Sequence, residues 1–147
     1  MLFPALALAL PFLLQAPGYT DEALRVERHS AWDRQVQAVV VRNVGSSTLV
    51  DYIDTTWSGS DIATFDLTKC PILQRSLVPE RGPKAFASKE RTADGGVVIH
   101  PDGPAFTGAA KAPYRDLLGA ERIDGNMLTP FGQWADVLLE AANLCRP

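Results

Sequence analysis

The sequence predicts an α+β domain in which a mostly antiparallel sheet packs against a C-terminal helix, with a short second helix joined to it by a disulfide. Three observations support this fold class. Strand-like runs separated by turn residues occupy the first half of the chain, and a capped amphipathic helix closes it. The only two cysteines lie at the start of the predicted short helix and at the end of the closing helix.

The first elements are predicted to be strands. Leu24, Val26 and Arg28 alternate with polar neighbours, and residues 36–41 are rich in valine, both of which are typical of strands. A helix from Thr20 to Arg34 is the alternative, because Thr20 followed by two acidic residues resembles a helix cap. The alternation favours strands.

Residues 43–47 have the Asn, Gly and Ser composition of a turn, and residues 49–57 then resume extended character. We expect these runs to form an antiparallel hairpin. Because side chains alternate along a strand, the second run has two faces. One face carries Leu49, Asp51, Ile53, Thr55 and Trp57, and the other carries Val50, Tyr52, Asp54 and Thr56.

The next region, residues 58–68, is polar and turn-rich, so it is expected to be a connection whose Ile62, Phe65 and Leu67 still need apolar contacts. Cys70-Pro71 then indicates the start of a helix of about two turns, because proline suits the first helical position. Ile72, Leu73 and Leu77 give this helix an apolar face, and Pro79 disfavours its continuation.

Residues 80–96 are predicted to be an exposed loop. Residues 97–99 read as a short strand, and the His100-Pro101-Asp102-Gly103 turn lets residues 105–107 return antiparallel to it. The sequence pattern does not clearly predict the secondary structure of residues 111–126. Within them, residues 114–120 favour a helical turn and Ile123 favours a strand.

The closing helix has the clearest signals. Thr129 is a good N-cap and Pro130 suits the first position. An apolar stripe at three- and four-residue spacing predicts one buried face, widened by Val137 and Leu144. The stripe contains Phe131, Trp134, Leu138, Ala141 and Cys145, whereas Asp136 and Glu140 mark the solvent side. Gly132, which disfavours a helix interior, indicates close packing against a strand.

The first 18 residues contain no charged side chain and form an apolar segment followed by small residues, the pattern of a cleavable signal peptide. As a helix the apolar core spans only about 20 Å, against about 30 Å of bilayer hydrocarbon. We therefore expect cleavage, after Gly18 in preference to Ala16, and a single periplasmic or secreted domain of residues 19–147 with no stable membrane anchor.

The net charge and the number of cysteines limit which partners, metal ions and cofactors are expected. The net charge is -3 and no basic run exists, which argues against nucleic acid as a partner. An oxidising compartment favours a disulfide between Cys70 and Cys145. A reactive thiol or metal ligands are the alternatives, but neither His29 nor His100 lies at zinc-ligand spacing from a cysteine. No cofactor motif is found, so no cofactor is expected.

No local motif assigns a catalytic residue. His29 and His100 are candidates because histidine titrates near neutrality, but ordinary turn histidines fit equally well. The serines at positions 46, 47, 58 and 60 lack the Gly-x-Ser-x-Gly nucleophile elbow, even with Asp61 beside the last of them.

Other acidic residues give no stronger signal. Asp51 and Asp54 are expected on opposite faces of one strand, with Asp51 on a solvent-side face near a sheet edge. Asp124-Gly125-Asn126 resembles part of a calcium loop, but Ala135 stands where the last acidic ligand is needed, so no metal site is expected. Trp32, Tyr52 and Trp57 are candidates for a binding surface, although most aromatic side chains belong to a core.

The second half of the chain resembles small exported bacterial proteins whose activity is uncharacterised. The resemblance is carried by Cys70-Pro71 opening a helix, by His100-Pro101-Asp102-Gly103 before an apolar strand, and by Thr129-Pro130-x-x-x-Trp134 leading to Cys145. It implies export and carries no catalytic residue to this chain.

These observations lead to three function hypotheses. The first is a non-enzymatic envelope or secreted accessory that binds a protein or a small ligand. The second is a small exported hydrolase whose serine, histidine and aspartate converge only in three dimensions. The third is a periplasmic inhibitor of a lytic enzyme or protease, with residues 84–94 or the turn at residues 101–103 as its inhibitory loop.

Overall fold

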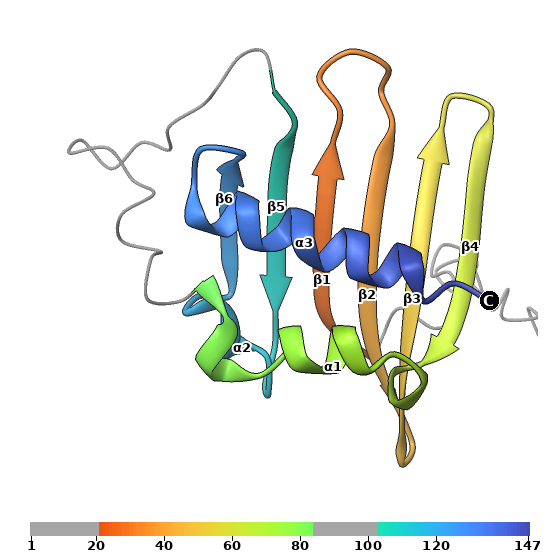
Figure 1. The fold of residues 1–147 in the computed structure, drawn as a ribbon, viewed down its shortest axis with the longest axis vertical. Helices are drawn as coiled ribbons and strands as arrows, with labels where there is room; N and C mark the ends of the chain where they lie inside the picture. The colour runs from red at the N-terminus through yellow and green to blue at the C-terminus, as the bar shows by residue number, and fades with distance from the viewer. Residues whose placement is uncertain (1–20, 84–102) are drawn as a thin grey trace, which may run out of the picture.

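A six-stranded antiparallel sheet forms the centre of the structure, a computed structural model that describes residues 21–83 and 103–147. The strand order is β4-β3-β2-β1-β5-β6 (Figure 1). The strands are β1 (Glu22–His29), β2 (Val36–Val44), β3 (Ser47–Thr56), β4 (Gly59–Asp66), β5 (Ala105–Ala110) and β6 (Arg122–Asn126). The predicted α+β fold class is therefore confirmed.

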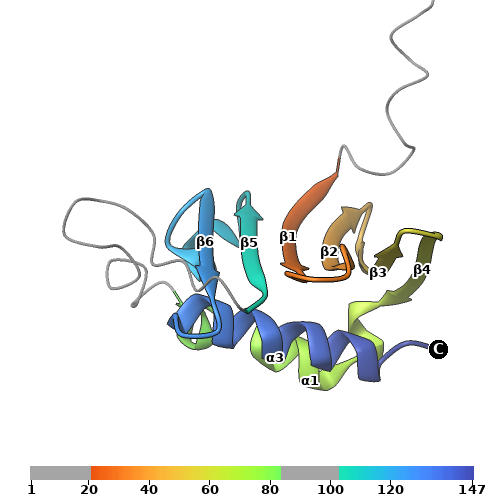
Figure 2. The same ribbon diagram turned by 90° about the horizontal axis from the view of Figure 1, so that it is seen from above.

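Helices cover one face of this sheet. The long helix α3 (Pro130–Leu144) crosses the strands, and the short helix α1 (Pro71–Ser76) lies beside it (Figure 2). The remaining helical elements are η1 (Leu67–Lys69), η2 (Pro79–Arg81) and α2 (Arg115–Leu118). Within the described residues no helix lies on the opposite face, which we call the open face. None of the described helices has the length and apolar character needed to span a bilayer.

The main core lies between the sheet and α3, and it depends on the strand alternation that the sequence predicts. On β3, Val50 and Tyr52 point into this core, whereas Ile53 joins Ala38 and Val40 in a smaller cluster on the open face. The largest fully buried core side chains include Leu24, Val26, Val39, Val41, Leu73, Phe106, Leu117, Leu118, Phe131, Leu138 and Leu139. Burying each removes apolar surface from water and contributes about 1.5–3 kcal/mol.

The predicted hairpin at residues 43–47 is confirmed, because β2 and β3 pair antiparallel from Val36↔Thr55 to Val44↔Ser47. The alternative helix over residues 20–34 is wrong, since β1 pairs with both β2 and β5. The two neighbouring strands supply hydrogen-bond partners for the backbone N–H and C=O groups of β1. This segment is therefore a strand, although the sequence that begins at Thr20 resembles a helix cap.

Strand β4 corrects the prediction of a turn-rich connection over residues 58–68. Residues 59–66 pair with β3 in continuous register, from Thr56↔Gly59 to Leu49↔Asp66. Gly, Ser and Asp have low strand propensity, but pairing with a long neighbour supplies the backbone hydrogen bonds that propensity alone does not. Phe65 gains its expected apolar contact by facing the main core.

The elements that follow Cys70 agree in part with those predicted from the sequence. Helix α1 begins at Pro71, α2 lies within the predicted helical turn, and Ile123 lies in β6. Strand β5 contains the predicted 105–107 strand, but the pairing predicted for it with residues 97–99 is wrong, because β1 and β6 occupy its two sides. The strand expected at residues 97–99, His100, and most of the predicted loop at residues 80–96 lie outside the described residues.

Helix α3 begins as predicted, because the Thr129 side chain accepts a hydrogen bond from the Gly132 backbone N–H at 3.1 Å. The expected widening of its apolar stripe is wrong, since Val137 is 63% exposed and Leu144 is 76% exposed. A helix that lies on a single sheet buries only one stripe. Leu139 and Ala142 are buried on the side of the helix that faces the sheet instead.

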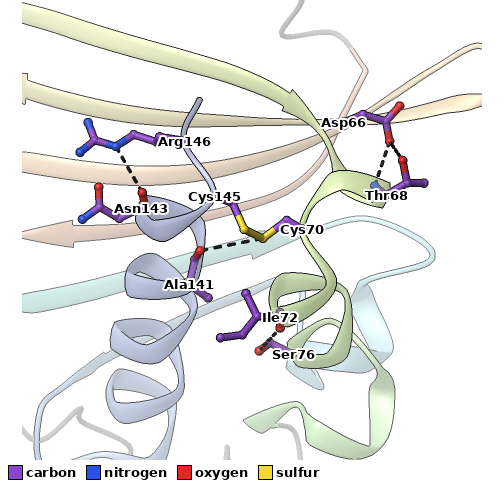
Figure 3. Close-up of a disulfide and its surroundings, with 9 residues drawn as sticks. All are labelled: Asp66, Thr68, Cys70, Ile72, Ser76, Ala141, Asn143, Cys145 and Arg146. Carbon is purple, nitrogen blue, oxygen red and sulfur yellow. Dashed lines mark hydrogen bonds between the residues drawn. A yellow bond between two sulfur atoms is a disulfide. The ribbon is translucent and has the colours of Figure 1, made fainter.

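The predicted disulfide between Cys70 and Cys145 is present, and its Cα atoms are 5.7 Å apart. It joins the residue before α1 to the residue after α3 (Figure 3). Cys70 Sγ also lies 3.9 Å from the Ala141 carbonyl oxygen, in a fully buried position. The bridge therefore fixes α1 beside the last turn of α3, across 75 residues of sequence.

Candidate ligand-binding site

Two exposed tryptophans project from one end of the sheet. Strands β1 and β3 run in the same direction, so the β1–β2 loop (residues 30–35) and the β3–β4 turn (residues 57–58) lie at the same end (Figure 1). Trp32 in the loop is 81% exposed, and Trp57 in the turn is 90% exposed. We call this region, residues 30–35 and 57–58, the tryptophan end.

Of the three aromatic candidates for a binding surface, Tyr52 instead has the core position expected of most aromatic side chains. It is 3% exposed and belongs to the main core. Burial is the main cause that raises the pKa of its phenol, with the negative charge of Asp54 adding to it. The ring of Tyr52 also lies 5.1 Å from the Arg146 guanidinium carbon.

A hollow of about 240 Å³ lies beside Trp32. Its walls come from the end of β1, the β1–β2 loop, the start of β2 and the residues before β5. The lining residues are Arg28, Ser30, Ala31, Trp32, Gln35, Gln37, Gly103 and Pro104. The hollow therefore combines one large aromatic side chain with a guanidinium group, two amides and a hydroxyl.

Hydrogen bonds to α3 and β3 hold the inner polar groups of the hollow. Arg28 Nη1 donates to Asp136 Oδ1 of α3 at 2.6 Å and lies 3.8 Å from Glu140 Oε1. Arg28 Nη2 donates to Gln37 Oε1, and Gln37 Nε2 donates to the Tyr52 hydroxyl at 3.1 Å. Asp136, predicted to face solvent, is instead a half-buried partner of the sheet.

The loop that carries Trp32 is also held by hydrogen bonds. Asp33 Oδ1 accepts from the Gln35 backbone N–H at 3.0 Å, and the Ser30 N–H donates to the Gln35 carbonyl at 2.9 Å. The Ser30 side chain and the Gln35 N–H together lower the pKa of Asp33. Arg34 has a left-handed backbone with a φ of 57°, an unfavourable conformation for its side chain.

Gln35 connects this loop to the neighbouring hairpin, because its Nε2 donates to Asp54 Oδ1 at 2.8 Å. Each glutamine amide has two N–H groups and an oxygen with two lone pairs, so the recorded bonds leave further hydrogen-bonding capacity. The hollow therefore offers oriented donors and acceptors next to an aromatic face. This combination suits recognition of a polar ligand.

His29 lies close to the hollow in sequence, but its recorded partner is on the open face. Its Nε2 is 2.9 Å from Glu27 Oε2, and Glu27 also accepts a hydrogen bond from Arg25. Burial lowers the pKa of Arg25, but hydrogen bonds and charge interactions with Glu22 and Glu27 outweigh it, so the net shift is upward. Within residues 21–83 and 103–147, no recorded hydrogen bond joins a serine hydroxyl to His29.

The candidate serines in the β3–β4 turn and at the start of β4 bond to neighbouring threonines. Ser58 Oγ lies 2.9 Å from Thr56 Oγ1, and Ser60 Oγ lies 2.9 Å from Thr55 Oγ1. These contacts stabilise the hairpin locally. The structure therefore does not bring the predicted serine, histidine and aspartate together among the residues it describes, and His100 lies outside that part of the chain.

Asp51 corrects another expectation. It lies on the open face of β3, beside the edge strand β4, but it does not face solvent, because neighbouring side chains leave Asp51 only 6% exposed. Arg42 Nε donates to its Oδ2 at 2.7 Å, and Thr64 Oγ1 donates to its Oδ1 at 2.7 Å. Asp54 bonds to Gln35 instead, in agreement with the predicted opposite orientation of the two carboxylates.

The calcium-loop fragment at residues 124–126 forms part of strand β6, which is not the open loop that such a site requires. Across the described ranges, no cluster of three or more His, Cys, Asp or Glu side chains is arranged to hold a metal ion.

Arg28, Gln35 and Gln37 were not singled out from the sequence, although Arg28 carries a usable signal. The alternation that predicts β1 places Arg28 on the same face as Leu24 and Val26, which is the buried face. A charged residue on a buried face needs a partner. That partner, Asp136, is 108 residues away in sequence, so no local pattern identifies it.

Comparison with protein-family models, curated proteins and solved structures found no match to this chain.

Proposed function

We propose that this protein is a non-enzymatic envelope or secreted accessory that binds a small polar ligand at the tryptophan end. The observation that carries the proposal is the hollow beside Trp32, where an exposed indole ring adjoins polar groups fixed by a hydrogen-bond network. Hydrogen bonds already hold the backbone of the loop that carries Trp32, so a ligand does not have to order this loop when it binds.

A saccharide is the ligand class that fits this hollow best. A pyranose ring has one apolar C–H face, which stacks on an indole, and a rim of hydroxyls, which bond to amides and hydroxyls. Trp32 supplies the aromatic face, and Ser30 and Gln35 supply polar groups beside it. The volume of about 240 Å³ lies below the ~300–1,000 Å³ of drug-sized pockets. It therefore suits a single sugar ring.

Export completes the proposal. Residues 1–18 have the composition of a signal peptide, and the Cys70–Cys145 disulfide is a bond that persists in oxidising compartments. The periplasm or the exterior of the cell is therefore the proposed location. Saccharides are abundant in the cell envelope, which makes them accessible to a protein in that location.

One observation favours a second candidate, a small exported hydrolase. Glu27 and His29 form a carboxylate–imidazole pair, the arrangement that orients a general base. A hydrolase converts its ligand, whereas an accessory releases it unchanged. Mass spectrometry of the saccharide after incubation with the protein, and with a His29→Ala variant, separates these two functions.

The inhibitor hypothesis rests on residues 84–94 and on the turn at residues 101–103, most of which lie outside the described residues. It predicts a stoichiometric enzyme partner in place of a saccharide.

The test is calorimetric titration of the exported, disulfide-bonded protein with a panel of neutral and N-acetylated oligosaccharides. We expect saturable binding to at least one of them. Trp32→Ala removes the stacking surface and is expected to weaken binding by about tenfold or more, the equivalent of about 1.4 kcal/mol.

Trp57→Ala is the matched control, because Trp57 is equally exposed in a neighbouring turn but does not line the hollow. It is expected to bind as the unaltered protein does. No binding to any saccharide at millimolar concentration, or an equal loss in both tryptophan variants, contradicts the proposal.

A further inference from the structure

A second hollow, of about 540 Å³, lies at the end of the sheet opposite the tryptophan end. Strand β1 begins beside it, and β5, which is antiparallel to β1, ends beside it (Figure 1). Four alanines and five charged residues line this second hollow. Its volume falls within the ~300–1,000 Å³ that is typical of small-molecule sites.

Alanine side chains give the second hollow its space and an apolar floor. The four alanines are Ala23, Ala109, Ala110 and Ala112. Ala109 on β5 is opposite Arg25 on β1 and opposite Arg122 on β6. Residues directly opposite one another share a face of the sheet, so the Ala109 methyl group lies between two much longer side chains. This contrast in size forms a recess over β5.

Both carboxylates of the lining already have arginine partners. The charged lining residues are Glu22, Lys111, Arg115, Glu121 and Arg122. Arg25 Nε donates to Glu22 Oε1 at 2.7 Å and Arg25 Nη2 donates to Glu22 Oε2 at 3.1 Å, so both oxygens of Glu22 are engaged. Glu121 Oε1 lies 3.1 Å from Arg115 Nη2, in a pair whose side chains are mostly exposed. An exposed pair of this kind contributes little stability.

Two further cations of the lining have no carboxylate partner. Within residues 21–83 and 103–147, no recorded ion pair or side-chain hydrogen bond involves Lys111 or Arg122. Asp124, the next acidic residue on the same face of β6, does not line the second hollow. The lining therefore carries an excess of positive charge, although the chain as a whole has a net charge of -3.

Hydrogen bonds hold the backbone segments that carry these charges. The Lys111 N–H donates to the Ala23 carbonyl at 2.9 Å, and the Lys111 carbonyl accepts from the Arg115 N–H at 3.0 Å. The Ala110 N–H donates to the Glu121 carbonyl at 2.9 Å, which joins the end of β5 to the residue before β6. A ligand therefore does not have to order the backbone of this site when it binds.

We propose that the second hollow binds a small organic oxyanion, in which a carboxylate or a phosphate monoester is attached to a compact apolar group. Lys111 and Arg122 supply charge-assisted hydrogen bonds, and a guanidinium group matches two oxygens of such an anion at once. The apolar group lies on the alanine floor. The site shares no lining residue with the hollow beside Trp32, so it does not depend on the proposed saccharide binding.

NMR titration of the exported, disulfide-bonded protein at physiological ionic strength tests the proposal, with benzoate and phenyl phosphate as probes. We expect saturable shifts of the Lys111 and Arg122 backbone amide signals with at least one probe. Benzamide, which has the ring but no charge, is expected to cause none. The probe that binds more tightly identifies the oxyanion. Inorganic phosphate is expected to bind about tenfold more weakly than phenyl phosphate, because it buries no apolar surface on the alanines.

Lys111→Gln combined with Arg122→Gln removes both unpaired cations and is expected to weaken binding by about tenfold or more. Lys69→Gln combined with Arg75→Gln is the matched control. It also removes one exposed lysine and one exposed arginine, but neither residue lines the second hollow. Because both double variants change the net charge equally, the control is expected to bind as the unaltered protein does.

Ala109→Leu tests the apolar floor, because it fills the recess and keeps every charge. It is expected to weaken binding of the probe by about tenfold, whereas Trp32→Ala is expected to leave it unchanged. No saturable shift with either probe at millimolar concentration overturns the proposal, as does an equal loss in the two double variants. Binding of benzamide or inorganic phosphate as tightly as the probes, or unchanged binding by Ala109→Leu, also overturns it.

Discussion

Asp51 is the residue at which the sheet depends most on electrostatics. Its side chain and that of Arg42 are 9% and 15% exposed, and both charges are paired across adjacent strands. Thr64 on β4 bonds the same carboxylate, so one side chain links three strands. A buried charge that loses its partner keeps its desolvation penalty, which makes this position more sensitive than an ordinary surface ion pair.

We predict that Asp51→Ala lowers the free energy of unfolding by about 3 kcal/mol, because it removes a buried carboxylate that accepts hydrogen bonds from both Arg42 and Thr64. Urea denaturation followed by circular dichroism measures this change. Asp54→Ala is the control, since the Asp54 carboxylate accepts a hydrogen bond from the Gln35 amide, and this substitution is expected to cost less than about 1.5 kcal/mol. Equal losses in the two variants would contradict the role assigned to Asp51.

At the scale of elements, Gly132 determines how closely α3 approaches β6. A Cβ atom at this position would lie 1.8 Å from the Asn126 carbonyl oxygen, a backbone atom that cannot move independently. The expectation that this glycine reflects close packing against a strand is therefore confirmed. Two effects oppose each other on substitution, because alanine favours a helix by about 1 kcal/mol whereas the clash requires the helix to move.

We predict that the clash is the larger effect and that Gly132→Ala lowers the free energy of unfolding by about 1–3 kcal/mol. Differential scanning calorimetry measures the accompanying fall in Tm. Val137→Ala provides the opposite case on the same helix, because Val137 is 63% exposed and its replacement changes helix propensity alone. An unchanged or higher Tm for Gly132→Ala would show that α3 does not pack on β6 in this way.

The elements that could be predicted from sequence are those with local signals. Helix α3 has a cap, a proline and a periodic stripe, and α1 begins at Pro71. Strand β4 could not be predicted, because Gly59, Ser60 and Asp61 favour turns and the pairing that overrides them involves β3. Val137 was misassigned because periodicity gives the width of an apolar stripe but not which side the sheet covers.

The same distinction applies to the candidate site. Trp32 could be identified as an aromatic residue in a turn-like segment, but not as the wall of a hollow. The inner wall depends on Arg28 and Gln37, which are fixed by partners on α3 and β3. These contacts join residues that are far apart in the sequence, so they cannot be predicted from composition or from the spacing of residues.

At the scale of the whole molecule, the disulfide holds the helical layer together. It closes a loop with a sequence separation of 75 residues, which contains α1, η2, β5, α2, β6 and the whole of α3. The chain-entropy relation gives about 4–5 kcal/mol for such a loop, a large part of the ~5–15 kcal/mol that stabilises a domain.

We predict that replacing Cys70 and Cys145 together by serine lowers the free energy of unfolding by about 4 kcal/mol, and that reduction of the unaltered protein has a similar effect. Chemical denaturation with and without reductant measures both. A loss below about 1 kcal/mol would mean that core packing alone fixes α1 beside α3.

The indole N–H resonances of the protein report directly on the proposed binding of a ligand at the hollow beside Trp32. The chain has three tryptophans, Trp32, Trp57 and Trp134, so each gives one assignable signal. In a titration with the best-binding saccharide, we predict a saturable shift of the Trp32 signal with the other two unchanged. A shift confined to Trp57 or Trp134, or no shift at all, would contradict the claim.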